Sequence, residues 1–458
     1  MSSKYIIEFK HLIKIGLPIF GSQMSYMLMS ATDTIIAGNA SSSDQAGLAV
    51  GTAILNTVWF LIAGVIFSVT PIVAQLYGAK KFIEIGHKLR EVLWIAFFLG
   101  FFLALLFFNL ESILRIFPAE DSLSIISINY LKAVSPGILF LTLFTCLRCY
   151  SEGMTLTKPI FVIAFTGMII NIPLDLIFVY GWFGIPKLGG VGCGIATSIV
   201  AFLMMLILFF YISKSKKYKK TKPFLKFTFT SFSTVKEVFK LGLPIGIGIF
   251  FELSMFSGSV IILKILFDDI VVASHAVAIN IAALFFMVPL SIGLASATRV
   301  GNLIGENRPK DAKTASYSTV YFCIIAAIIN ILIILIFGSN IISFYSNELP
   351  VINLAISLII FAAIFQLPDG IQMGALGSLR GYKDTFIPMI LLFISYWVFA
   401  MPIGYYLTIA GFNEPMGVYG MWIGMIIGLS IFSFLSIGRM KWIIQKNIKT
   451  SEQEPRLL

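Results

Sequence analysis

Long apolar runs separated by short polar stretches dominate the pattern of the chain. Each run has about 20 residues, which is the length that a helix needs to cross a bilayer. The runs predict an all-α polytopic membrane protein with twelve transmembrane helices. They lie near residues 15–37, 46–72, 92–109, 129–151, 160–180, 189–212, 241–264, 272–297, 316–338, 351–378, 385–408 and 417–438.

The two halves of the chain repeat one another. Residues 14–19 read KIGLPI and residues 240–245 read KLGLPI, 226 positions later. Because each half has an even number of spans, the halves must be parallel repeats, related by an axis along the membrane normal. The repeat predicts two six-helix bundles, with the substrate path in a cavity between them. We expect lobes at 1–213 and 241–458, joined by a basic cytoplasmic linker at 214–240.

Composition supports a membrane protein. The chain of 458 residues is 58% hydrophobic and 12% charged with a mean hydropathy of +0.94, which excludes an ordinary soluble globular protein. Most Lys and Arg residues fall on the side that carries both termini, so the positive-inside rule predicts cytoplasmic termini. The exceptions are Arg115, Lys132, Lys187 and Lys264. We therefore interpret the lysines of residues 214–226 as contacts to lipid headgroups. No nucleic-acid partner is expected.

The sequence offers few residues for cofactor chemistry. It has neither a Walker A pattern nor an HExxH motif, and it holds only 3 histidines. The pair Cys146 and Cys149 forms a CxxC motif, but two ligands are too few for a zinc site. No cofactor is expected, and no cleavable signal peptide is evident at the N-terminus.

Four acids are the unusual residues of this chain: Asp33, Asp175, Glu252 and Asp369 lie inside apolar runs. A charge at the centre of a membrane helix costs roughly 2.5–3.5 kcal/mol, so such residues usually face a bundle interior and have a function. The interior of each surrounding run has no Lys or Arg to neutralise the acid, since Lys264 stands only at the end of the run that holds Glu252. We therefore expect these acids to bind a cation or carry a proton.

Depth along the helices groups the acids into two pairs. Asp33 and Asp175 are both about five or six residues from the outer ends of their spans, counted at 1.5 Å per residue. Asn171 is one helical turn from Asp175 on the same face. Two carboxylates and an amide carbonyl would suit Na⁺ or, with one acid protonated, H⁺. Glu252 and Asp369 form a second pair, closer to the midplane.

Aromatic residues could line a substrate cavity. Most of the 43 Phe residues are expected to face lipid or pack between helices. Tyr26, Trp59 and Phe251 are our candidates for the cavity wall. His275 has two interpretations: a titrating gate, or a buried side chain bonded to a neighbouring helix.

Several motifs together resemble the multidrug and toxic compound extrusion (MATE) transporters over nearly the whole chain. Residues 33–38 read DTIIAG and residues 71–79 read PIVAQLYGA. The C-terminal half adds Glu252 after the GLP motif. It also contains ASH at 273–275, RVGN at 299–302, PDG at 368–370 and LRGY at 379–382.

The resemblance carries expectations for the site and the activity. Glu252 with Asp369 looks like the C-lobe acidic pair of the NorM branch, and Asp33, Asn171 and Asp175 look like the N-lobe cation site, with Thr197 as an additional ligand. Asp175 departs from the Asn that NorM members often carry, which leaves the coupling ion open. The family implies a secondary active antiporter that exports organic, often cationic, compounds in exchange for Na⁺ or H⁺.

Two other functions are weighed against efflux. A lipid-linked precursor flippase of related architecture would need basic residues in its cavity to hold phosphates. A polytopic membrane enzyme would need a His- or Ser-based constellation at one membrane face, for which His87 with Glu84 is the only candidate. The short loops favour a bacterial inner membrane, and we expect a monomer.

Overall fold

The structure is a computed structural model that describes residues 3–111, 122–226, 228–343, 345, 348–411 and 413–453. Every regular element in these ranges is helical, which confirms the predicted all-α class. In the first half the elements are α1 (Ser3–Ala40), α2 (Ser42–Phe67), α3 (Val69–Gly78), α4 (Phe82–Phe108), α6 (Ser122–Gly153), α7 (Lys158–Tyr180), η1 (Trp182–Gly184), α8 (Gly190–Lys214) and η2 (Lys216–Tyr218). In the second half they are α9 (Phe232–Leu266), α10 (Asp269–Gly305), α11 (Pro309–Ile342), α12 (Leu349–Gly381), α13 (Phe386–Phe393), η3 (Ile394–Ala400), α14 (Met401–Ile409) and α15 (Val418–Gln453).

The helices match the predicted membrane spans. Within the described residues, 11 helices are long and apolar enough to cross a membrane, and each coincides with a predicted run. Two of these spans are composite: α2 continues into α3, and α13 continues through η3 into α14. The remaining predicted span lies in α1, whose 38 residues are long enough but include many polar side chains around Gln23 and Asp33. The chain is a multi-pass membrane protein.

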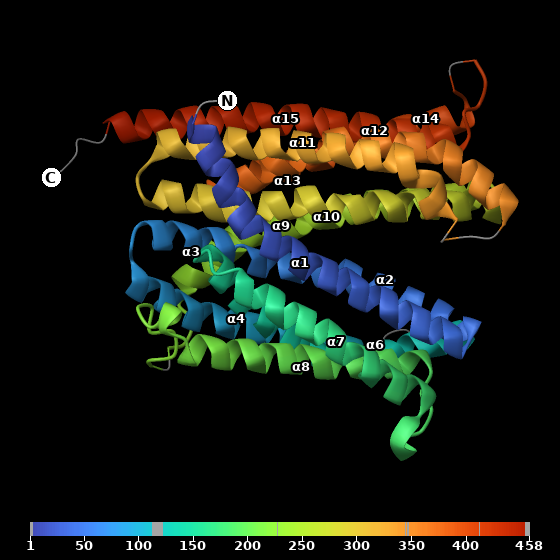
Figure 1. Ribbon diagram of the computed structural model, residues 1–458, viewed down its shortest axis with the longest axis horizontal. Coiled ribbons are helices and arrows are strands. Elements are labelled where there is room, and N and C mark those ends of the chain that lie inside the picture. Colours follow the sequence, from blue (N-terminus) through green and yellow to red (C-terminus); the bar gives the residue numbers. More distant parts are fainter. Residues whose placement is uncertain are drawn as a thin grey trace. The chain divides into compact units, whose positions relative to one another are not determined.

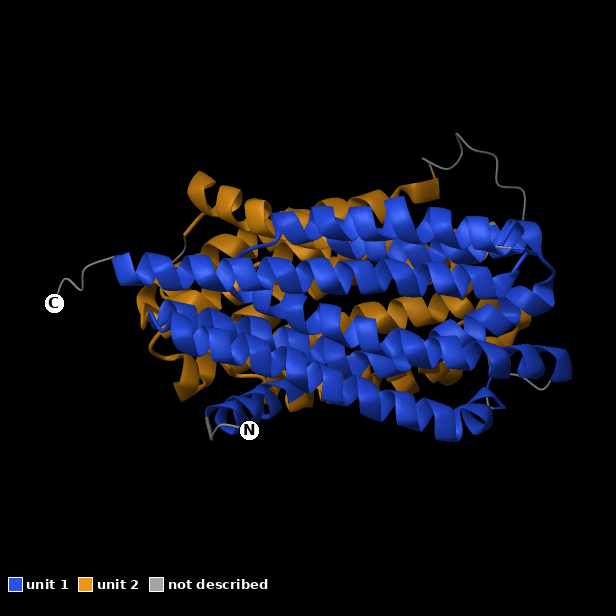
Figure 2. Ribbon diagram, turned by 90° about the horizontal axis from the view of Figure 1, so that it is seen from above, with its two compact units in different colours: residues 1–16, 247–458 blue, residues 17–246 orange. Residues whose placement is uncertain are grey.

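The chain divides into two compact units (Figure 2). We call residues 17–246 the N-terminal unit, and residues 1–16 with 247–458 the C-terminal unit. Helix α1 therefore changes unit after Gly16 and α9 changes unit after Gly246. The predicted functional limits of the lobes, at 213 and 241, stay a prediction, because compactness and function need not divide the chain at the same place.

In the N-terminal unit α6 is the central helix. It packs against α2, α3, α4 and α8, and α7 packs against α8 (Figure 1). The buried core of this unit includes Leu147 and Tyr150 from α6, Leu89 from α4 and Leu208 from α8.

In the C-terminal unit α12 has the corresponding central place and packs against α10, α11 and α15 (Figure 1). Trp422 of α15 is fully buried beside Leu358 and Phe365 of α12. The first turns of α1 belong to this unit, because both carboxylate oxygens of Glu8 accept hydrogen bonds from Arg299 of α10 at 2.7 Å.

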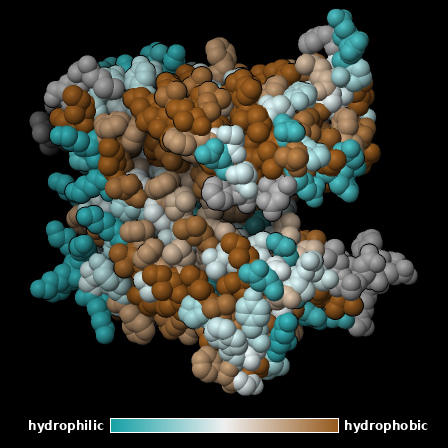
Figure 3. Space-filling model, turned by 45° about the vertical axis from the view of Figure 1, so that its right-hand side comes forward, coloured by the Kyte–Doolittle hydropathy of each residue, from teal (hydrophilic) through white to brown (hydrophobic). Residues whose placement is uncertain are grey.

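Large apolar side chains remain exposed on the outer helix faces. Phe434 is 80% exposed and Phe102 is 64% exposed. Figure 3 shows broad apolar areas on the surface of the protein, with hydrophilic side chains mainly towards the ends of the helices. Exposed apolar area of this extent is typical of a surface covered by lipid.

The basic linker is attached to the N-terminal unit. Tyr218 is buried, and its hydroxyl donates to Oγ of Ser151 at 3.0 Å. The hydroxyls of Tyr150 and Thr221 lie 2.6 Å apart, and Arg90 donates to the carbonyl of Lys222 at 3.0 Å. Helix α9 begins at Phe232, within the predicted linker range. Arg115, counted above on the opposite side, lies outside the described residues.

Candidate functional site

The first acid cluster lies in the N-terminal unit, where α1, α7 and α8 meet. Oγ1 of Thr197 donates to Oδ2 of Asp33 at 3.4 Å, and Asp33 also interacts with the side chains of Asn171 and Asp175. The structure thus brings together all four predicted residues of this site. Pro173 lies between Asn171 and Asp175 in α7, and a proline inside a helix leaves a backbone carbonyl without its usual donor.

Apart from Oδ2 of Asp33, the carboxylate and amide oxygens of this cluster are buried and lack donors. Asn171 and Asp175 are fully buried, and neither their side chains nor Oδ1 of Asp33 has a hydrogen-bond partner among the described residues. The other groups that interact with the two acids are Tyr130 and Cys193, which carry no positive charge. Buried polar atoms are normally paired, so oxygen atoms arranged in this way suit a small hard cation.

No richer metal site is present in the described part of the chain. No group of three or more His, Cys, Asp and Glu residues there could hold a metal ion. Asp33 and Asp175 supply two carboxylates, and the other oxygens would come from neutral groups such as Asn171 and Thr197. Such a ligand set fits Na⁺ better than a transition metal.

The second acid cluster lies in the C-terminal unit, between α9 and α12. The amide nitrogen of Gln372 donates to Oδ1 of Asp369 at 2.8 Å and to Oε1 of Glu252 at 3.4 Å. The hydroxyl of Tyr396 donates to Oε1 of Gln372 at 2.7 Å. Pro368 precedes Asp369, and its carbonyl accepts a hydrogen bond from Oγ of Ser433 on α15 at 2.6 Å.

A base from outside the apolar runs approaches the acids of the C-terminal cluster. Arg380 in the last turn of α12 attracts Glu252 electrostatically. The reason is geometric, since a helical side chain points back towards the N-terminus of its helix. A long arginine outside the apolar run can therefore reach an acid inside it.

Tyr26, a candidate for the cavity wall, lies beside a buried ion pair. The Arg148 guanidinium is 6.0 Å from the centre of the Tyr26 ring and 5.5 Å from that of Phe67. Nε of Arg148 lies 3.6 Å from Oε1 of Glu152, one turn further along α6. This base lies within a predicted span, but Glu152 compensates its charge, so it offers no free phosphate site of the kind a flippase would need.

The other three candidates for the cavity are divided between the two units. Trp59 packs against the apolar core around Ile36 and Leu48 in the N-terminal unit. Phe251 lies in the C-terminal unit, with its ring centre 4.9 Å from that of Phe393. His275 is fully buried, and its Nε2 lies 3.2 Å from Oγ of Ser259. Their roles in substrate binding stay predictions.

His87 and Glu84 do not form a catalytic pair. Glu84 pairs with Lys81 at 3.2 Å, whereas Nδ1 of His87 lies 3.4 Å from Oε2 of Glu91. Oε2 of Glu91 also accepts a hydrogen bond from Thr234 at 2.5 Å, which ties α4 to the start of α9. This arrangement gives no support to the enzyme alternative.

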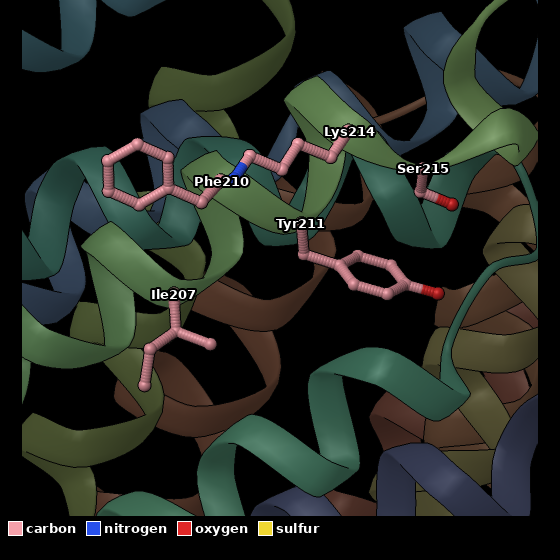
Figure 4. Close-up of a pocket in the computed structure, with 5 residues that line it drawn as sticks. All are labelled: Ile207, Phe210, Tyr211, Lys214 and Ser215. Atoms are coloured by element: carbon pink, nitrogen blue, oxygen red, sulfur yellow. The ribbon is translucent and has the colours of Figure 1, made fainter.

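A surface groove of about 520 Å³ lies at the C-terminal end of α8, in the N-terminal unit. Its lining consists of Ile207, Phe210, Tyr211, Lys214 and Ser215. Figure 4 shows the Lys214 side chain lying back along the helix towards Phe210. Nζ of Lys214 is 6.0 Å from the centre of the Phe210 ring. None of the four acids lines this groove, so we do not assign the substrate path to it.

The sequence pattern did not indicate two residues of the C-terminal cluster, Gln372 and Tyr396. Gln372 follows Asp369 by three residues in an apolar helix, so a search for polar neighbours on the same helix face would have found it. Tyr396 lies 24 residues further along the chain than Gln372, and no spacing rule connects it to the acids. In the N-terminal cluster, Cys193 and Tyr130 were likewise missed because neither is polar enough to stand out.

Curated relatives of this chain are named as multidrug resistance proteins. The chain is similar to the multidrug resistance protein MdtK of Yersinia enterocolitica, with 35% identity over 445 residues and 96% of each chain covered. The corresponding protein of Yersinia pestis is 34% identical over 442 residues, again with 96% of each chain covered.

Solved structures with the same fold are MATE transporters. The chain is similar to the eukaryotic MATE transporter AtDTX14, with a TM-score of 0.86, 20% identity and coverage of 98% of this chain and 100% of the other. It is also similar to a MATE protein in the straight conformation, with a TM-score of 0.88, 18% identity and coverage of 96% and 97%. The MatE family profile matches residues 18–177 and 244–406. The chain therefore belongs to the MATE family of transporters, as the sequence motifs predicted.

Proposed function

We propose that this protein is a secondary active multidrug efflux antiporter. It exports small organic compounds, often cationic, from the cytoplasm in exchange for inward Na⁺ or H⁺, by alternating access of its two helix bundles. Relatives named as multidrug resistance proteins support this function. It has no enzymatic activity and uses no cofactor.

The observation that carries the proposal is the pair Asp33 and Asp175. Two buried carboxylates that interact across α1 and α7, with no base among the described groups around them, repel one another. A cation or a proton removes this repulsion, so the cluster has a physical reason to take up a coupling ion. Asn171 and Thr197 supply further oxygen ligands. The pair Glu252 and Asp369 serves as the second coupling site.

Ion binding drives transport because the ion has different affinities for two conformations of the protein. An ion that binds one arrangement of the bundles better than the other shifts the population towards it. A cationic substrate competes with the coupling ion for the same negative charge, and aromatic rings contribute through cation–π contacts. Substrate is thus released as the ion loads. Tyr26, Trp59, Phe251 and His275 are the proposed contacts of the substrate.

The protein acts in a bacterial inner membrane as a monomer with both termini in the cytoplasm. The lysines of residues 214–226 support this orientation, because cytoplasmic loops carry an excess of basic residues. Tyr218 and Thr221 attach the linker to the N-terminal unit. The attached linker presents its lysines to anionic headgroups.

The test is ion-driven efflux from liposomes. Purified protein is reconstituted, and transport of ethidium is followed under a Na⁺ gradient, a pH gradient or neither. The variants are Asp33→Asn and Asp369→Asn. The control is Asp311→Asn, a half-buried acid that pairs with Arg308 at the start of α11.

We expect a gradient of one ion to drive efflux, with a loss of at least about tenfold in Asp33→Asn, equivalent to about 1.4 kcal/mol. Na⁺-driven efflux that depends on Asp33 would assign sodium coupling to the N-terminal cluster. Efflux driven only by a pH gradient would make the acids proton carriers. Absence of gradient-driven efflux of any cationic dye would contradict the antiporter and favour a flippase.

A further inference from the structure

The amide of Gln372 has an orientation that its neighbours determine. Its oxygen accepts a hydrogen bond from the hydroxyl of Tyr396, and its nitrogen faces Asp369 and Glu252. An ionised carboxylate can only accept hydrogen bonds, so the amide nitrogen is the end that suits the acids. Gln372 and Tyr396 are both almost fully buried, at 1% and 0% exposed, so water does not replace these contacts.

We propose that Gln372 is a placeholder for the coupling cation in the C-terminal cluster. Its amide nitrogen bridges the two acids while the cation is absent and must move away before the cation can bind between them. This inference rests on the proposed function and adds a residue that sets the affinity of the site for its ion.

The competition follows from the atoms involved. The nitrogen of Gln372 donates to one oxygen of Asp369 and one oxygen of Glu252, which are the oxygens that would coordinate a shared cation. Two buried carboxylates repel each other, and N–H donors relieve part of that repulsion without carrying a full positive charge. The amide therefore stabilises the ion-free state, and the cation must displace these hydrogen bonds.

Tyr396 holds the placeholder in position. Its ring packs edge-on against Phe432 with ring centres 5.9 Å apart. It lies in the π-helical segment η3, and π-helical segments of this kind are frequent at functional sites. Removing the Tyr396 hydroxyl would leave the amide free to turn, which would weaken its hold on the acids without removing it.

The inference predicts the direction in which ion affinity changes. Gln372→Met keeps the side-chain length but removes the donor, so the ion-free state loses stability and the cation binds more tightly. Loss of a hydrogen bond to a charged group should change the affinity for the cation about tenfold. If Gln372 instead supplied a ligand or only maintained the fold, the same substitution would weaken ion binding or leave it unchanged.

The experiment measures the concentration of the driving ion, Na⁺ or H⁺, that gives half-maximal ethidium efflux and half-maximal thermal stabilisation of the purified protein. The matched control is Gln366→Met: Gln366 lies on the same helix, is fully buried and bonds Asn330 and the carbonyl of Ala282 instead of the acids. We expect the half-saturating concentration to fall about tenfold in Gln372→Met, less in Tyr396→Phe, and not at all in the control.

An unchanged or higher half-saturating concentration in both Gln372→Met and Tyr396→Phe, with an ion-dependent wild type, would overturn this inference alone. Should Gln372→Met fail to fold, Tyr396→Phe decides by the same criterion. A wild-type protein with no ion dependence in either measurement would overturn the proposed function and the placeholder together, because no cation would then compete with the amide.

Discussion

Oγ of Ser259 lies 3.2 Å from Nε2 of His275 inside the C-terminal unit. Ser259 occupies the position in the sequence repeat that Asp33 occupies in the first half, so the repeat carries a carboxylate in one unit and a serine hydroxyl in the other. The ring of His275 also meets Trp422 edge-on, with ring centres 5.6 Å apart. This environment favours the interpretation of His275 as a buried structural side chain.

We therefore expect Ser259→Ala to lower stability without changing ion coupling. The loss should be about 1 kcal/mol, the usual net contribution of one hydrogen bond. Thermal unfolding of the purified protein and ion-driven efflux measure the two effects separately. A loss of coupling with normal stability would instead support His275 as a titrating gate.

Thr197→Val tests the hydroxyl that approaches Asp33. Valine has the shape of threonine but cannot donate a hydrogen bond, so the Asp33 carboxylate loses its one donor from α8. Valine also removes a proposed oxygen ligand of the ion, so we expect the half-saturating ion concentration to rise. The rise should be at most about tenfold, because the contact with Asp33 is long at 3.4 Å. Thr166→Val is the control, since that hydroxyl is exposed and bonds the backbone of its own helix. Equal effects of the two substitutions would argue against a role for Thr197.

The ion pair between Glu8 and Arg299 should stabilise the attachment of α1 to the C-terminal unit. Removing one partner of a largely buried pair costs about 3 kcal/mol, because the other charge is left uncompensated. We expect Glu8→Ala to lower the unfolding temperature, and Glu8→Leu combined with Arg299→Met to recover most of the loss.

Its control is the exposed pair Lys310 and Glu452, with side chains 75% and 57% exposed. Lys310→Ala should change stability by less than about 1 kcal/mol, as is usual for surface pairs. If Lys310→Ala and Glu8→Ala had equal effects, the Glu8 pair would have no special structural role.

Gly86→Ala should detach the linker from the N-terminal unit. A Cβ atom at Gly86 would lie 1.9 Å from the carbonyl oxygen of Thr221, which is too close for any rearrangement of side chains alone. In a helix, alanine is otherwise favoured over glycine by about 1 kcal/mol, so any destabilisation must come from this contact. Faster trypsin cleavage after the linker lysines would report the change.

Gly438→Ala is the control for that experiment, because no atom lies within 4 Å of its Cβ position. It should leave cleavage unchanged. Slow cleavage in both variants would mean that the linker does not depend on close contact with α4.

The linker attachment should also be insensitive to pH in the physiological range. Burial raises the pKa of Tyr218, outside the membrane spans, to about 12. A pKa that is raised on folding gives a contribution to stability that is present below the unfolded value, near 10, and is lost as the pH rises towards 12. Trypsin cleavage of the linker, corrected for the activity of trypsin itself, should be constant between about pH 6 and 9. An increase within that range would show that another group controls the attachment.

The sequence by itself was sufficient for the class of protein and the number of spans. Length and hydrophobicity of a run are properties of consecutive residues, and a bilayer selects helices by them. It was also sufficient for the acids, because a carboxylate such as Asp33 in an apolar run is conspicuous whatever surrounds it. Helical spacing also connected Asn171 to Asp175, because residues four apart lie on the same face of a helix.

Only the tertiary structure decided which groups meet the acids across helices. Each residue turns a helix by about 100°, so contacts between different helices depend on how each helix is rotated and packed. Tyr396 reaches Gln372, and Arg380 attracts Glu252, through such packing. The asymmetry between Asp33 and Ser259 could be read from the repeat, but the partner of Ser259 could not, because His275 comes from another helix.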